Sequence, residues 1–100
     1  MEEQQLINNY MGLTVQSHPL LEHLNNVDYK HNWANLMPVI IKISHFKFED
    51  GETAYPITFG MLNEETENPM FRFNRMPLHE AETLIKAAYE ACIEWITSFN

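Results

Sequence analysis

The sequence predicts a single α+β domain in which a three-stranded antiparallel sheet is packed by a long C-terminal helix and by one or two shorter N-terminal helices. Three observations lead to this prediction. Apolar residues recur at helical spacing through residues 77–99, they alternate with other residues through the centre of the chain, and Asp50-Gly51 is a strong hairpin turn signal. No internal repeat or linker divides residues 1–100, so we expect one domain.

The first element predicted is a short helix over residues 2–11. From Leu6 onward its apolar residues lie at i, i+1, i+4 and i+5, which makes one apolar stripe. Gly12 comes directly after this stripe and suits a helix stop. Residues 13–31 have the least regular pattern, with one helical turn expected at residues 20–24.

A second helix is predicted over residues 32–43, and its proline allows two interpretations. The helix either starts near Asn32 and kinks at Pro38, or is capped by Asn35 so that Pro38 lies in its first turn. The sequence leaves open whether Trp33 is a core residue or a partly exposed anchor. In both interpretations the same apolar residues share one face: Trp33, Leu36, Met37, Ile40 and Ile43.

The centre of the chain predicts the sheet. Its strands are expected at residues 45–49, 55–62 and 70–74, because apolar and other residues alternate there. Pro56 cannot donate a ladder hydrogen bond, so the second strand is expected to have a free edge or a bulge at that residue. The acidic segment 63–69 is predicted to be a solvated loop. Such a sheet needs a helical layer over its aromatic face.

The C-terminal helix is expected to supply that layer, starting at Pro77 or Leu78 and ending at Phe99. Proline suits the first helical position, and Glu80 and Glu82 lie early, where the helix dipole favours carboxylates. The predicted core stripe is nearly unbroken: Leu78, Ala81, Ile85, Ala88, Cys92, Trp95, Ile96 and Phe99.

Composition excludes several classes of protein. Fourteen acidic residues against six basic ones give a net charge of −8, which argues against a general nucleic-acid binder. One cysteine permits no internal disulfide and no cysteine-based zinc site. No apolar run approaches the roughly 20 residues that span a bilayer, and no secretory signal pattern is present. We therefore expect a cytoplasmic protein with no membrane partner.

The residues that could carry catalysis or hold a metal have ordinary explanations. The five histidines lack the spacing of metal ligands, and Cys92 lies on an apolar stripe with Glu90 and Glu94 nearby, which disfavours a thiolate. The glutamates of residues 64–67 suit a solvated loop, and three glycines leave little material for a phosphate-binding loop. We expect no catalysis, no metal and no cofactor.

Three basic residues are candidates for ligand binding. Lys47, Arg72 and Arg75 could hold an anionic or nucleotide ligand by charge pairing, with stacking on nearby rings. The alternative, which the alternation favours, puts the rings in the core and the charges on the opposite face. The rings concerned are Tyr55, Phe71 and Phe73.

Two segments resemble a known group of proteins. Residues 29–43 fit the pattern Y-x-x-x-W-x-x-L-M-P-V-x-x-K-I, and residues 85–96 fit I-x-A-x-Y-x-A-x-x-E-x-I. Together with the opening of residues 6–12, they resemble a group of small uncharacterised proteins of bacteriophages and Bacteroidetes-type bacteria. The resemblance implies a phage or prophage setting and no particular activity.

The expected function is therefore binding, by a small acidic phage-type protein whose partner is a host protein or a second copy of itself. An acidic surface suits a partner with a basic patch, and a homodimer fits a small domain rich in aromatic residues. An exposed apolar patch or an unpaired sheet edge would favour this function over ligand binding or catalysis. The alternative is an oligomer that sequesters a small anion or nucleotide, for which Lys47, Arg72 and Arg75 must converge. An enzyme would require a histidine or carboxylate pair in a cleft.

Overall fold

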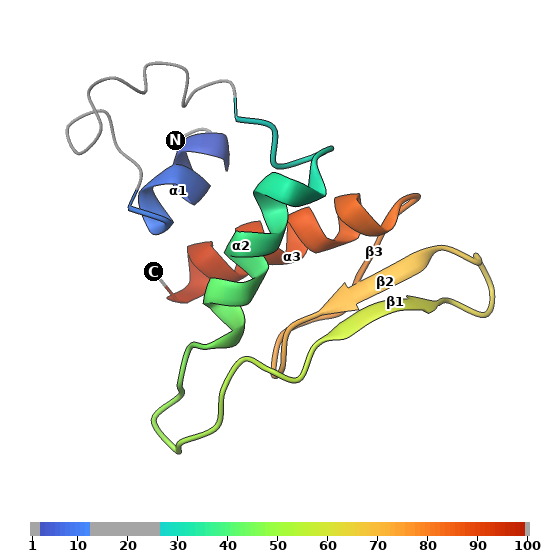
Figure 1. Ribbon diagram of the computed structural model, residues 1–100. Helices are drawn as coiled ribbons and strands as arrows, with labels where there is room; N and C mark the ends of the chain where they lie inside the picture. Colours follow the sequence, from blue (N-terminus) through green and yellow to red (C-terminus); the bar gives the residue numbers. More distant parts are fainter. Residues whose placement is uncertain (1–2, 13–26, 100) are drawn as a thin grey trace.

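The computed structural model describes residues 3–12 and 27–99, and within them the chain has an α+β fold. The strands form an antiparallel sheet in the order β1-β2-β3, and α3 packs against all of them (Figure 1). The predicted fold class is confirmed. The elements are α1 (Glu3–Tyr10), α2 (Trp33–Ser44), β1 (Thr58–Leu62), β2 (Pro69–Arg72), β3 (His79–Glu80) and α3 (Leu84–Phe99).

β1 is an edge strand with one irregularity. Phe59 lies opposite Phe71 of β2, but the register shifts by one residue before Leu62, which lies opposite Pro69. Gly60, inside this bulge, has a φ of +89°, a conformation that glycine adopts without steric cost. The free edge or bulge expected at Pro56 does not occur there, because the strand predicted at 55–62 begins only at Thr58 and its bulge lies between Phe59 and Leu62.

Residues 45–49 do not form a strand of the sheet, which corrects the prediction. They belong to a small separate hairpin with a single bridge between Lys47 and Thr53. The turn at Asp50-Gly51 is confirmed, because the Gly51 amide donates to the Phe48 carbonyl over 3.0 Å. The hairpin packs by its rings against the end of α3: Phe46 contacts Trp95 and Phe48 contacts Phe99, with ring centroids 5.0 and 5.8 Å apart.

The third strand of the sheet comes from a segment predicted to be helical. Residues 79–80 pair with β2 as strand β3, so the helix starts at Leu84 and not at Pro77 or Leu78. Thr83 caps it, since its Oγ1 accepts from the Lys86 amide over 3.3 Å. The strand predicted at residues 70–74 corresponds to β2, the middle strand, which ends at Arg72 and so leaves residues 73–74 outside it.

α2 starts next to Asn32, as the first of the two interpretations predicted. The Asn32 side chain caps it by accepting a hydrogen bond from the Ala34 amide over 2.9 Å, and Pro38 lies inside the helix. The interpretation with Asn35 as the cap is wrong, because that side chain donates to the Asp28 carbonyl over 3.1 Å. α1 ends at Tyr10, and Gly12, expected to follow the helix as its stop, has a φ of +77°. The turn predicted at residues 20–24 lies outside the described residues.

The core lies where α3 meets the sheet, α1 and α2. Two members of the predicted helical stripe, Leu78 and Phe99, are instead exposed by 49 % and 43 %. Leu78 precedes β3, and Phe99 is the last residue of α3. The largest fully buried side chains are Ile7, Leu36, Val39, Ile40, Ile43, Phe71, Phe73, Cys92, Trp95 and Ile96.

Candidate functional site

Two of the three basic residues singled out in the sequence come together. Lys47 and Arg75 line one open pocket of about 510 Å³, whose described lining does not include Arg72. Arg72 is an exposed residue at the end of β2. Two of the rings proposed to stack on a ligand, Phe71 and Phe73, are fully buried and cannot reach one. The third, Tyr55, is exposed.

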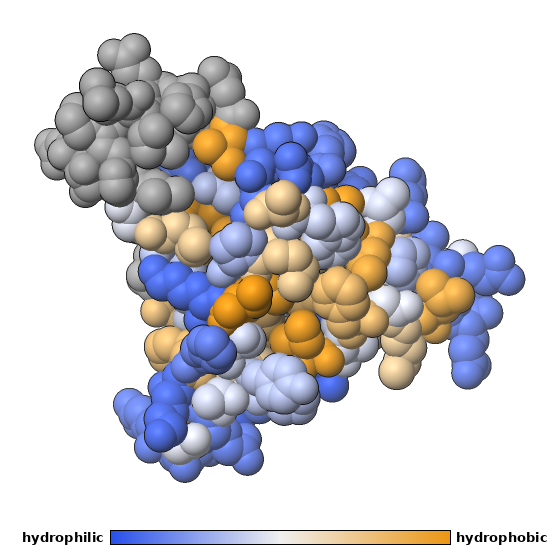
Figure 2. Space-filling model, viewed as in Figure 1, coloured by the Kyte–Doolittle hydropathy of each residue, from blue (hydrophilic) through white to orange (hydrophobic). Residues whose placement is uncertain are grey.

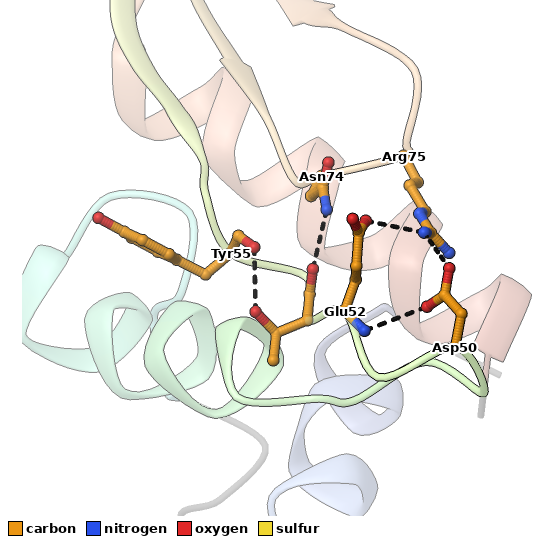
Figure 3. Close-up of polar contacts among 6 residues, drawn as sticks. Asp50, Glu52, Tyr55, Asn74 and Arg75 are labelled. Carbon is orange, nitrogen blue, oxygen red and sulfur yellow. Dashed lines mark hydrogen bonds and ion pairs between the residues drawn. The ribbon is translucent and has the colours of Figure 1, made fainter.

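Arg75 is already engaged by carboxylates (Figure 3). Its Nη2 donates to a carboxylate oxygen of Asp50 and, over 2.7 Å, to Oε2 of Glu52, and its guanidinium lies 4.9 Å from the centroid of the Phe48 ring. The hydrogen bond from Arg75 lowers the pKa of Asp50, and the same bond raises the pKa of Arg75. An anionic ligand at Arg75 would have to compete with both carboxylates.

These contacts fasten the small hairpin to the turn after β2. In Figure 3 the neighbouring Asn74 side chain also reaches the hairpin, donating to the Thr53 carbonyl over 2.9 Å. The Asn74 amide donates to the Ala54 carbonyl over the same distance. Arg75 therefore has a structural role in this arrangement, as one part of a clamp.

The candidate catalytic residues are engaged in structural contacts. Cys92 is fully buried, and burial raises the pKa of its thiol far above the usual value. The ring of His79 contacts the Glu94 carboxylate, which joins β3 to α3. Within residues 3–12 and 27–99, no group of three or more histidine, cysteine or acidic side chains lies close enough together to hold a metal ion.

The turn between β1 and β2 is acidic and fixed in place. The carboxylate of Glu80 in β3 accepts three hydrogen bonds from it, at 2.6, 2.9 and 3.4 Å. The donors are Asn63, Thr66 and Asn68. The carboxylates of Glu64, Glu65 and Glu67 are exposed on the same turn.

An apolar surface runs along α2 and β1, and we call it the α2–β1 surface. Trp33, Met37 and Ile41 are spaced four residues apart on one face of α2, and the Trp33 ring lies 5.5 Å from the Phe59 ring of β1. Figure 2 shows hydrophobic residues over α2 and the β1–β2 hairpin. The residues of this surface are Trp33, Met37, Ile41, Phe59, Met61 and Leu62. Because Met61 and Leu62 are neighbours in β1, their side chains lie on opposite faces of the sheet at its free edge.

Four of its members are well exposed, and Trp33 and Met37 are partly buried against the core. Ile41 is exposed by 50 %, Phe59 by 46 %, Met61 by 64 % and Leu62 by 58 %, and Trp33 is half-buried. Trp33 is thus partly exposed and also packs against the core. Alternation in the sequence marked Phe59 and Met61 as apolar, but it could not show that the described residues leave them 46 % and 64 % exposed.

No known protein family, curated protein or solved structure matches the chain. Among the described residues no helix is both long and apolar enough to cross a membrane.

Proposed function

We propose that this chain acts by binding another protein through the α2–β1 surface and that it carries out no catalysis. The observation that carries the proposal is the exposure of Phe59, Met61 and Leu62 on one five-residue edge strand. The contact between Trp33 and Phe59 joins this strand to the apolar stripe of α2. Contiguous exposed apolar surface is typical of interaction sites.

The energetics of this surface suit association. Fully burying a side chain such as methionine or phenylalanine gains about 1.5–3 kcal/mol, and a partner would cover several of them at once. Tryptophan is enriched among residues that dominate binding energy, and Trp33 already rests against Phe59, so it loses little freedom on binding. The outer side of β1 also has no strand partner among the described residues.

The setting we propose is a phage or prophage protein acting in the cytoplasm on a host protein. It is supported by the resemblance of residues 29–43 and 85–96 to small phage-type and Bacteroidetes proteins. A net charge of −8 favours a partner with basic groups, because complementary charge speeds association.

The alternative function, a small-anion or nucleotide-binding oligomer, has less support. Arg75 is held by Asp50 and Glu52, and Arg72 does not join the pocket that Lys47 and Arg75 line. Native mass spectrometry of gently purified protein separates the two functions. A reproducible extra mass in the range of a nucleotide would favour the alternative.

Affinity capture with matched variants tests the proposed function. Met61→Gln removes an exposed apolar side chain from the α2–β1 surface, and Leu78→Gln removes one next to β3, the strand at the other edge of the sheet. We expect a partner that is retained by the wild type and by Leu78→Gln, with affinity for Met61→Gln reduced about tenfold. Equal retention by all three proteins would contradict the proposal.

A further inference from the structure

Charge is distributed unevenly around the α2–β1 surface. Residues 48–71, which include β1, contain six acidic residues and no lysine or arginine. Residues 33–41 of α2 carry no charge at all. The apolar residues of the surface therefore carry no charge themselves. The charged residue of α2, Lys42, donates to the Tyr10 carbonyl, and the other charges considered lie at the ends of the β1–β2 hairpin.

The turn end of this hairpin is strongly acidic. Glu64, Glu65 and Glu67 are exposed, and the described residues form no ion pair with them. Glu80 adds a fourth carboxylate, and its three hydrogen bonds fix the turn against β3. A fixed cluster of carboxylates attracts cations without first having to be ordered, which lowers the entropic cost of binding. Figure 2 shows hydrophilic residues at the outer tip of the hairpin, next to hydrophobic ones.

The opposite end of the hairpin is balanced. Arg72 lies across from Thr58 at the start of β1, and the small hairpin with its clamp lies just before β1 in the chain. The groups there are three basic residues, Lys47, Arg72 and Arg75, and three acidic ones, Glu49, Asp50 and Glu52. The β1–β2 hairpin thus has one acidic end and one end without excess charge.

We propose, on the basis of the function proposed above, that the occupant of the α2–β1 surface is a segment of a partner protein that is apolar along its length and basic at one end. The apolar side chains lie against Phe59, Met61 and the exposed stripe of α2. The lysine or arginine residues lie beside the turn of residues 63–68. The charge asymmetry therefore determines which end of the segment lies at the acidic turn. It also determines that this end contains basic residues.

A second copy of this chain meets these requirements less well. In an antiparallel pairing of two β1 strands, the acidic turn of each copy would lie beside the balanced end of the other, which carries no net positive charge. The bulge between Phe59 and Leu62 also interrupts the edge that would pair. Each copy would in addition bring a net charge of −8.

Selection from a library of random 12-residue peptides against the full chain tests this inference. We expect enriched peptides to combine an apolar run with two or more lysine or arginine residues at one end. For a synthesised enriched peptide, Glu64→Gln/Glu65→Gln should raise Kd about three- to tenfold at low salt. The control Glu82→Gln/Glu90→Gln changes the net charge equally and should raise Kd less than twofold. Adding salt should remove the difference.

Other outcomes separate this inference from the proposed function. Neutral or acidic peptides that bind the wild type and lose affinity for Met61→Gln would overturn the basic segment and leave protein binding intact. Peptides that bind wild type and Met61→Gln equally, or no enrichment at all, would count against both proposals. A chain that forms dimers, with Met61→Gln monomeric, would identify a second copy as the occupant and overturn the inference.

Discussion

Arg75 was a candidate ligand-binding residue in the sequence, but in the structure it makes contacts that stabilise the fold. Its φ of +69° lies in the left-handed region, which costs a non-glycine residue roughly 1–2 kcal/mol. Contacts with Asp50, Glu52 and the Phe48 ring hold it there. The sequence identified this residue as basic and exposed, but the carboxylates that engage it are more than 20 positions away along the chain.

The Asp50 carboxyl should report this clamp directly. Its pKa lies below the usual value of 3.8, chiefly because Arg75 donates a hydrogen bond to the charged form. A carboxyl whose pKa is lowered in the folded protein stabilises the fold at pH values above its usual pKa. That stability is lost as the pH falls through the lowered pKa. We expect Arg75→Gln to raise the pKa of Asp50 towards 3.8 in an NMR titration of the side-chain carboxyl. Arg72→Gln, which removes the same charge, should leave it unchanged, and an equal response to both substitutions would contradict the clamp.

At the scale of elements, the sequence was most informative about features that depend only on contacts within one short segment. The stop at Gly12 and the Asp50-Gly51 turn occur as expected, and α2 starts next to Asn32 as one of its two interpretations had it, because each feature depends on neighbouring backbone groups. Residues 77–83 were predicted to be helical because a proline and early glutamates suit a helix start. Glu80 instead binds the distant turn of residues 63–68, a tertiary contact that local patterns do not encode.

The candidate surface could be predicted only in part for the same reason. Helical and alternating periodicity identified Trp33, Met37, Phe59 and Met61 as apolar, and of these Trp33 contacts Phe59. Whether another element covers them depends on how α2 and β1 lie relative to α3. That arrangement rests on contacts between residues far apart in the sequence, such as the contact between Trp33 and Phe59.

The turn of residues 63–68 should depend on β3 through Glu80. Glu80→Ala removes the acceptor of three hydrogen bonds, two of them partly buried, and leaves Asn63 and Asn68 without that partner. We expect a loss of about 1–2 kcal/mol in the free energy of unfolding. Hydrogen exchange of the backbone amides of residues 63–68 should also become faster. Exchange in α3 should become faster only by the amount that the loss of global stability explains. In the control Glu82→Ala, at an exposed position, the turn should keep its wild-type exchange rates.

Considered as a whole molecule, the chain divides its apolar residues between two tasks. α3 contacts α1, α2 and all three strands, and the residues it covers form the core. The apolar residues of β1 lie at the margin of this arrangement, where α3 does not cover them. A protein with a net charge of −8 has ample polar residues for its surface, so an uncovered apolar strand suggests a task other than folding.

This division predicts opposite effects on folding and on binding. Met61→Gln and Ile41→Gln alter side chains that are half or more exposed, so each should change the free energy of unfolding by less than about 0.5 kcal/mol in urea titrations. Phe71→Ala empties a fully buried site opposite Phe59 and should cost about 3–5 kcal/mol. If Met61→Gln instead cost about 2 kcal/mol or more, the β1 side chains would belong to the core and the argument for a binding surface would fail. A variant that folds like the wild type yet loses its partner would show that these residues serve binding and not stability.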